Sequence, residues 1–514
     1  MYEEDNLDSY DLGKPLTNRS KGFNQNLKII IFLVTLNIIL IGLVTFGIIN
    51  LFDDGNNEDD DNKLFVLKHD KDFIKPNIKL NLEFELVQLE NNMTGLIISD
   101  PYSTKMHAQF QVENGYLTDT IGGIAHLAEH MIFAGSEKHN KFYPYDRTFS
   151  STKGFEMNGI TDKIFQAYYL SIYNNYKYKE TIDLMIDAFK HPLYDKEIIE
   201  KEIQPINSEF YEGYRDINFL MEDIIRQFSS DKTPYNGFGC GNNKTLNPAE
   251  SESISKKLKQ YHMIINRPEN IFFVFYSNLS LKNSEKYIKK YFNYKMYEFP
   301  ENEIDTKFKE DFENNINKLT NIEIFDNNLY KHGIYFNSNI KLNILDIFFH
   351  IGNVDYKDIQ FDLIEYYDFL FNSKNLLQKL KHEEYIIDTD RIRVLTYELI
   401  ENNNIMVIEL VLTEKGLNDL EKVLIIIYKY IEIMKEQGYK EEYFDNFIKY
   451  KNNINIINCQ KSSFTSRIFN NILLLTQNYR LYGENQIFMT GTPNESNFNE
   501  KKLKNYLNNI KYEN

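Results

Sequence analysis

The first long hydrophobic run of the chain covers residues 29–52 and contains no charged residue. About 20 apolar residues are enough for a helix to span the hydrocarbon core of a bilayer. A cleaved signal peptide has a shorter apolar stretch of roughly 7–15 residues that ends in small residues, whereas this run is longer and ends in Leu51 and Phe52, directly before Asp53. We therefore expect residues 29–52 to form a retained transmembrane anchor.

The charges on either side of this run predict its orientation. Basic residues precede it within residues 1–28, and acidic residues follow it in a polar tether at residues 53–64. By the positive-inside rule the N-terminal tail is cytoplasmic and the remainder lies across the membrane, in a lumenal or extracellular position. The sequence thus predicts a single-pass membrane protein.

Beyond the tether, strand-like and helix-like patterns alternate. Short apolar runs that predict strands and longer amphipathic stretches that predict helices follow one another. The predicted strands lie at residues 84–87, 96–99, 271–276 and 405–412, and the predicted helices at 121–134, 178–189, 197–214 and 417–435.

A polar, charged stretch around Pro300 separates two such regions and predicts a linker. We assign residues 65–300 to a first domain, 301–316 to the linker and 317–514 to a second domain of similar build. The expected fold class is α+β: two similar domains, each a mixed sheet with helices on one face, preceded by one transmembrane helix.

Composition narrows the possible functions. The formal net charge of -17 argues against nucleic acid as the main partner, because phosphate binding needs a basic face. Two cysteines, Cys240 and Cys459, are too few for a disulfide framework or a cysteine-based zinc site. A single bond between them, and glycosylation, are left open.

One short motif carries recognisable chemistry. His126 and His130 are four residues apart in a predicted helix, so both imidazoles project from one face, and Glu129 lies on that face too. Two imidazoles are good zinc ligands, and a carboxylate beside a zinc-bound water can accept its proton. The His-x-x-Glu-His order is the inverzincin motif. The alternative interpretation is a helix with two partly exposed histidines paired to a glutamate.

A catalytic zinc takes three protein ligands, and the predicted helix 197–214 offers candidates for the third. Glu202 and Glu209 are seven residues apart and share one helical face two turns apart. Without the histidines, a solvated acidic helix face would be the better interpretation of these glutamates.

Several further motifs resemble the insulinase family of metallopeptidases, in particular its insulin-degrading and pitrilysin-like branch. The resemblance covers about residues 65–294 and continues more weakly toward residue 507. The motifs that carry it are Met-Ile-Phe-Ala-Gly at 131–135, the glutamate stretch 202–209, Asn-Gly-Ile-Thr at 158–161, Tyr168 with Tyr169, and Phe-Gly-Cys-Gly-Asn at 238–242.

The resemblance implies one zinc per chain with a defined set of roles. Zinc would be held by His126, His130 and Glu209, with Glu129 as the catalytic base and Glu202 as a supporting carboxylate. The substrate would be a peptide or an unfolded segment that adds as an extra strand beside the edge formed by Asn158, Gly159 and Thr161.

The sequence departs from the family pattern in several places. Pro205 lies between Glu202 and Glu209 and would kink a helix. One extra residue lies between Gly154 and Asn158. A Phe-rich segment, residues 369–375, replaces the family's glycine-rich exosite. The resemblance also covers only the first half of long members, whose second half closes over the substrate.

The predicted function is therefore a zinc-dependent metalloendopeptidase that hydrolyses peptides. The alternative is an inactive or partner-dependent half-size member that acts as a peptide-binding subunit. A second chain that supplies the closing half would reconcile the two. A mitochondrial presequence peptidase fits less well, because the N-terminus lacks basic amphipathic character.

Overall fold

The structure is a computed structural model. It describes most of the chain from residue 63 onward, namely 63–73, 82–139, 154–173, 178–295, 298–300, 302, 305–319, 333, 342–352, 363–372, 375–387, 392–400, 403–461, parts of 472–487, 498–508 and 510. Residues 62–514 form one compact unit. The predicted anchor at 29–52 lies outside the described residues, and none of the helices described is long and apolar enough to cross a bilayer.

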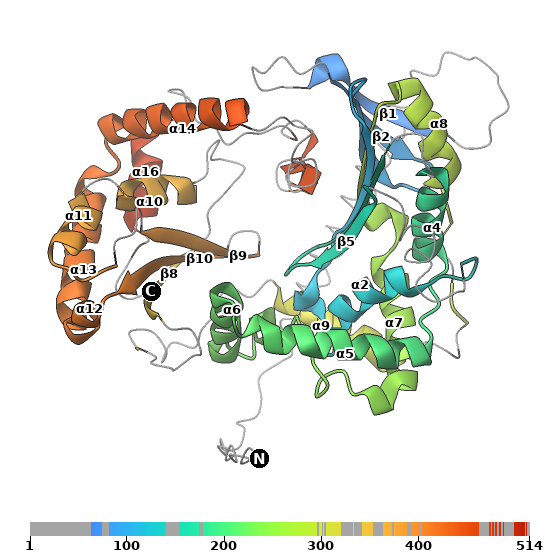
Figure 1. Cartoon of the computed structure of the whole chain (residues 1–514), viewed down its shortest axis with the longest axis horizontal. Helices are drawn as coiled ribbons and strands as arrows, with labels where there is room; N and C mark the ends of the chain where they lie inside the picture. Colours follow the sequence, from blue (N-terminus) through green and yellow to red (C-terminus); the bar gives the residue numbers. More distant parts are fainter. Residues whose placement is uncertain are drawn as a thin grey trace, which may run out of the picture. The chain divides into compact units, whose positions relative to one another are not determined.

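A seven-stranded sheet forms the framework of the first region (Figure 1). Its order is β1-β2-β3-β7-β4-β6-β5, and only β3 and β7 pair in parallel, so the sheet is mixed as predicted. Among the described strands, β5 has a neighbour on one side only. The strands are β1 Leu64–His69, β2 Glu83–Leu89, β3 Thr94–Ser99, β4 Lys105–Val112, β5 Glu156–Thr161, β6 Gln166–Tyr173 and β7 Ile271–Ser277.

Helices pack on one face of this sheet, as the sequence predicts (Figure 1). Side chains along β7 point alternately to the two faces of the sheet. Phe273 and Phe275 therefore lie in the large core under the helices, while Phe272 and Val274 lie in a second core on the opposite face. The helices of this region are α2 Ile124–Ala134, α4 Tyr178–Lys190, α5 Lys196–Gly213, α6 Ile217–Phe228, α7 Ser251–Ile265, α8 Leu281–Tyr291 and α9 Thr306–Lys318.

Helix α9 differs from the expectation for its segment. It occupies most of the stretch 301–316 that the sequence predicted as a polar linker. Asp305 caps its first turn by accepting hydrogen bonds from two backbone amides. Phe308 and Phe312 are buried in the core of the first sheet. Part of the predicted linker is thus an amphipathic helix packed on the first region.

The second region contains a three-stranded sheet in the order β8-β10-β9. Both pairings are antiparallel, so among the described strands the expectation of a second mixed sheet is wrong. Phe369 and Phe371 lie in helix α10, and Phe371 is fully buried, which explains the hydrophobic residues there. The elements are β8 Asn343–Gly352, α10 Leu363–Asn372, α11 Asn375–His382, β9 Arg393–Ile400, β10 Asn403–Leu412, α12 Glu414–Asn418, α13 Leu420–Gln437, α14 Glu441–Lys461 and α16 Glu500–Asn508.

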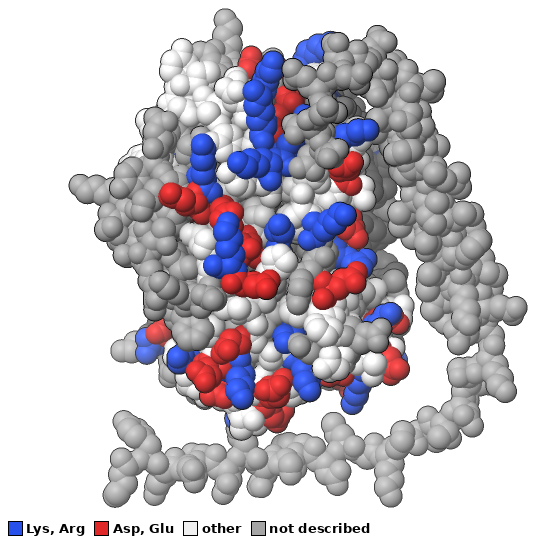
Figure 2. Space-filling view, turned by 90° about the vertical axis from the view of Figure 1, so that its right-hand side faces the viewer, with Lys and Arg blue, Asp and Glu red and all other residues white. Residues whose placement is uncertain are grey.

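Charges of both signs are interspersed on the face shown in Figure 2. Over the described residues of that face, lysines and arginines lie next to aspartates and glutamates and form no continuous basic area. This distribution agrees with the acidic net charge of -17.

Candidate metal centre

Helix α2 presents the two histidines, and its N-terminus is unusually well fixed. The Asp119 carboxylate accepts hydrogen bonds from the backbone amides of Gly123 (3.2 Å) and Ala125 (3.3 Å). Burial raises the pKa of the Asp119 carboxyl, although these two hydrogen bonds oppose the shift. Gly123 has a φ of 90°, and a Cβ there would lie 2.4 Å from the Cα of Gly241. Only glycine allows this close contact between the start of α2 and the 237–241 loop.

Helix α5 supplies the carboxylates. Asp195 caps it by accepting from the amides of Glu197 and Ile198, and the helix continues without interruption through Pro205 to Gly213. The Pro205 ring faces solvent. The predicted kink therefore does not end the helix, and Glu202 and Glu209 both face α2.

The histidines and Glu209 converge on one point. Glu209 Oε2 lies 3.3 Å from His126 Nε2 and 3.8 Å from His130 Nε2. The ligand atoms of these three residues all lie within 4.8 Å of one another. They form the one group of three metal-binding side chains found among the described residues.

This donor set fits zinc. A tetrahedral zinc ion with bonds near 2.0–2.1 Å would hold its ligands roughly 3.3–3.4 Å apart, close to the observed separation between His126 Nε2 and Glu209 Oε2. Two imidazole nitrogens and one carboxylate oxygen are the ligand set of several catalytic zinc sites, which leave a fourth position open. The residues present would therefore hold one zinc ion.

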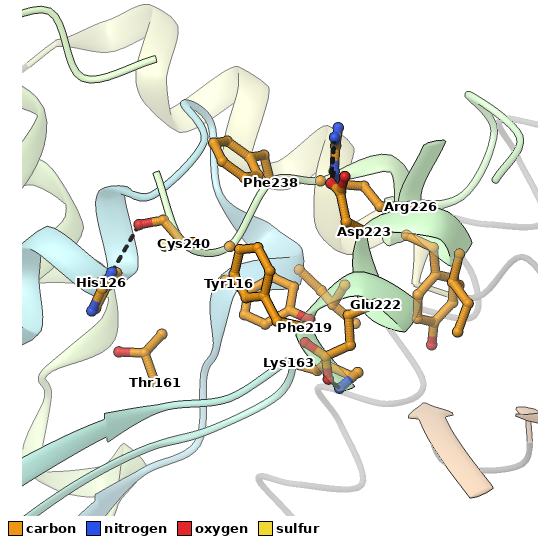
Figure 3. A pocket seen from close by; sticks show the side chains of 15 residues that line it. Tyr116, His126, Thr161, Lys163, Phe219, Glu222, Asp223, Arg226, Phe238 and Cys240 are labelled. Atoms are coloured by element: carbon orange, nitrogen blue, oxygen red, sulfur yellow. Dashed lines mark hydrogen bonds and ion pairs between the residues drawn. The ribbon is translucent and has the colours of Figure 1, made fainter. Parts of the chain in front are cut away.

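The second nitrogen of each histidine is already engaged. His126 Nδ1 lies 2.8 Å from the backbone carbonyl of Cys240 (Figure 3), and His130 Nδ1 lies 3.0 Å from Glu202 Oε2. A carbonyl or an ionised carboxylate can only accept, so Nδ1 carries the proton in both rings. This tautomer leaves the Nε2 lone pairs free to bind a metal.

The electrostatics follow the same geometry. The hydrogen bond from His126 lowers the pKa of the Glu209 carboxyl, although partial burial opposes it. Burial disfavours a charged His126, but its contacts with Cys240, Glu209 and Glu129 outweigh this effect and raise its pKa.

Glu129 is buried beside this cluster and is held from β5. Its Oε2 accepts a 2.6 Å hydrogen bond from Thr161 Oγ1. Gly159 leaves room for it, since a Cβ there would lie 2.4 Å from Glu129 Cγ. Gln166 Nε2 donates to Thr161 Oγ1 (3.1 Å) and to the carbonyl of Ala125 (2.8 Å), which ties β6 and β5 to α2.

The predicted substrate strand is regular. Asn158 pairs with Tyr169, Gly159 with Tyr168 and Thr161 with Gln166, without a register shift. The extra residue before Asn158 therefore does not disturb the facing of these side chains. Asn158 is exposed on the strand that ends the sheet.

Comparisons with known proteins agree with this arrangement. The model of the family Insulinase (Peptidase family M16) matches residues 95–230, which include both histidines and Glu209. The chain carries a domain of the insulinase family. It is 24% identical to Protease 3 of Escherichia coli K12 over 382 residues, which are 72% of this chain and 37% of that protein. It is 26% identical to human insulin-degrading enzyme over 185 residues, 35% of this chain and 18% of that protein.

The similarity in fold extends beyond the residues that the family model matches. The crystal structure of pitrilysin superposes with a TM-score of 0.69 at 21% identity, covering 88% of this chain and 46% of that one. The α+β architecture is therefore similar to that of pitrilysin. The chain spans less than half the length of these relatives.

Sequence reasoning missed several residues of this candidate metal site. The carbonyl of Cys240 belongs to the Phe-Gly-Cys-Gly-Asn segment that the sequence singled out, but a backbone group leaves no side-chain signal. Asp119 could have been found from its place before a helix, where acidic residues are common. Gln166 had no signal, because its role depends on the pairing of β5 with β6.

Proposed function

We propose that this chain is a zinc-dependent metalloendopeptidase that hydrolyses peptides or unfolded segments. The observation that carries the proposal is the convergence of two Nε2 atoms and Glu209 on one point, beside the buried Glu129. The division into a catalytic domain at 65–300 and a second domain at 317–514 is part of the proposal.

The roles of the residues follow from their positions. His126, His130 and Glu209 would hold the ion. A zinc ion bound there supplies a Lewis acid that polarises a peptide carbonyl and acidifies a water molecule. Glu129 takes the proton of that water and gives it to the leaving amine, and Thr161 orients its carboxylate. Glu202 holds the His130 ring in its metal-binding tautomer.

The substrate would bind along β5. Its outer edge has no strand among the described residues, and a peptide can add there through main-chain hydrogen bonds. Asn158, Gly159 and Thr161 would then lie beside the scissile bond. This mode of binding depends little on the peptide's sequence.

Two further parts of the proposal concern the whole protein. A helix at 29–52 would anchor it in a membrane with the N-terminus cytoplasmic and the catalytic domain lumenal or extracellular. A second chain would supply a closing half. The alternative function is a peptide-binding subunit that is inactive alone or depends on such a partner.

A cleavage assay with a quenched peptide pool tests the proposed activity. We expect the zinc-loaded full chain to cleave peptides, a chelator to abolish cleavage, and Glu129→Gln to reduce kcat by about 10²–10⁴-fold because it removes the general base. Glu129→Gln should still bind one zinc. A folded, zinc-loaded parent that binds peptides but cleaves none would contradict the enzyme proposal and support the subunit alternative.

A further inference from the structure

A buried network of hydrogen bonds leads from helix α7 to the carboxylate of Glu129. Tyr261, which is 1% exposed, donates from its hydroxyl to Gln166 Oε1 (2.8 Å). Gln166 is fully buried and donates from Nε2 to Thr161 Oγ1 (3.1 Å). Thr161 donates in turn to Glu129 Oε2 (2.6 Å). The network therefore crosses four elements, α7, β6, β5 and α2, before it reaches the residue proposed as the base.

The register of the β5–β6 hairpin explains why Gln166 reaches Thr161. The two residues are direct partners in this antiparallel pair, and the side chains of such partners lie within reach of each other on one face of the sheet. That face is turned toward the helices, because Tyr168, two residues further along β6, lies in the core under them. Strand pairing thus places Gln166 between Thr161 and α7.

A backbone carbonyl fixes the direction in which each of these groups donates. Gln166 Nε2 also donates to the carbonyl of Ala125 (2.8 Å), which can only accept, so the amide cannot be reversed. Thr161 must then accept from Gln166, and its single hydroxyl proton is left for Glu129. Gln166 Oε1 has to accept in the same way, which requires the proton of the Tyr261 hydroxyl.

The far end of the network is fixed by a second carbonyl. Asn114, in the loop after β4, donates from Nδ2 to the carbonyl of Gly115 (3.1 Å) and to the Tyr261 hydroxyl oxygen (3.3 Å). Burial raises the pKa of that hydroxyl, so Tyr261 keeps the proton that it donates. Every donor from Asn114 to Thr161 therefore points toward Glu129.

We propose that Tyr261 and Gln166 are positioning residues for peptide hydrolysis, which hold the Thr161 hydroxyl as a donor to Glu129 Oε2. Hydrogen bonds that all donate in one direction polarise and strengthen one another in a buried site. Because Oε2 is held in this way, the Glu129 carboxylate keeps one orientation beside the metal cluster. This inference rests on the proposed function.

A double-mutant cycle on the zinc-loaded full chain tests whether Tyr261 acts through Gln166. Tyr261→Phe removes only the hydroxyl, and we expect kcat for a quenched peptide to fall about three- to tenfold, the equivalent of one hydrogen bond, with KM and zinc content unchanged. Gln166→Met removes the amide and should lower kcat by about tenfold or more. The double variant should be no slower than Gln166→Met alone, since both residues act through the same network.

Two results of this cycle would overturn the proposal. The first is a parent-like kcat in Tyr261→Phe. The second is a loss of kcat on Tyr261→Phe that is as large in the Gln166→Met background as in the parent. Either result leaves the peptidase proposal intact, because the parent still cleaves.

Tyr194→Phe is the matched control for a general effect on packing. Tyr194 is 1% exposed, and its hydroxyl lies 3.1 Å from Nδ1 of His262, the residue that follows Tyr261 in α7. This substitution removes a buried tyrosine hydroxyl outside the network. Both tyrosine variants should lower the midpoint of urea denaturation by similar amounts, and only Tyr261→Phe should lower kcat. An equal loss of kcat in Tyr194→Phe would overturn the positioning role.

A measurement without catalysis separates this proposal from the proposed function. In the full chain with isotope-labelled glutamine side chains, the amide signal of Gln166 is assigned by its absence in Gln166→Met. Its protons should exchange with water about tenfold faster in Tyr261→Phe and in Thr161→Val, and at the parent's rate in Tyr194→Phe. If the parent cleaves nothing but exchange responds in this way, the peptidase proposal fails and the network stands. If exchange is the same in every variant, the network is overturned.

Discussion

At the scale of single residues, a hydrogen bond at Nδ1 fixes the orientation of each imidazole in the site. Both Nδ1 atoms are engaged by acceptors, the Cys240 carbonyl and the Glu202 carboxylate. These contacts orient both rings so that their Nε2 atoms point toward Glu209, where the ion would bind. Glu209 is about half exposed and is the most exposed member of the cluster.

Replacing Glu202 tests this orientation. Glu202→Gln keeps the volume of the side chain but loses the charge that holds His130, and we expect zinc affinity to fall about ten- to a hundredfold. Competition with a chromophoric chelator measures the affinity. Glu212→Gln, an exposed position on the same helix, is the matched control. Equal affinities for both variants and the parent would show that Glu202 does not orient the ligand.

Much of the site could be predicted at this scale. The spacing of His126, Glu129 and His130 predicted that they share one face of a helix, and the structure agrees. Glu202 and Glu209 also share one helical face, as their spacing predicted. Thr161 was expected to contact substrate, yet its hydroxyl holds Glu129. That contact depends on how β5 lies against α2, which local pattern does not determine.

At the scale of elements, α5 shows how a helix tolerates an interior proline. Pro205 lacks the amide that would donate to the preceding turn, which costs about 3 kcal/mol in a regular helix. The helix nonetheless runs from Lys196 to Gly213. Ile203 and Ile206, on either side of the proline, are fully buried, and this burial offsets the cost of the missing hydrogen bond.

Pro205→Ala should therefore stabilise the protein without changing the metal site. Restoring the helical hydrogen bond at an exposed position should raise the free energy of unfolding by about 1–3 kcal/mol. Urea denaturation measures this change, and zinc content should stay at one per chain. A variant that gains stability but loses zinc would show that the proline places Glu209.

Element prediction succeeded where the hydrophobic pattern was strong and failed where pairing or packing decides. The apolar run of β7 and the amphipathic α4 and α5 lie where the sequence placed them. The sequence analysis missed helix α9 because its segment has two phenylalanines among many charged residues, and a polar, charged stretch of this kind predicts a linker. The antiparallel pairing of β8, β9 and β10 could not be predicted, since periodicity identifies strands and not their partners.

At the scale of the whole molecule, two buried histidines tie stability to pH. His107 in β4 and His262 in α7 are buried, and burial lowers the pKa of each to about 3. Both are neutral in the folded chain, whereas in the unfolded chain they take up protons near pH 6.5. Stability is therefore full above that pH and falls as the pH drops toward 3.

His107→Gln should remove part of this dependence. Between pH 7.5 and 5.5 the parent should lose about 1 kcal/mol more of its free energy of unfolding than the variant, because a protonated His107 is favoured only in the unfolded chain. Urea denaturation at both pH values measures the loss. His382→Gln, at a side chain that is 83% exposed, should behave like the parent. Equal losses in parent and His107→Gln would contradict the neutral, buried state of this histidine.

The central claim is that His126, His130 and Glu209 bind one zinc ion, and metal analysis of the purified chain tests it most directly. Zinc content should be measured for the parent, for His126→Ala and for His382→Ala as a control far from the cluster in sequence. We predict one zinc per chain in the parent and the control, and none in His126→Ala. A folded parent without zinc, or a His126→Ala variant that retains it, would contradict the account.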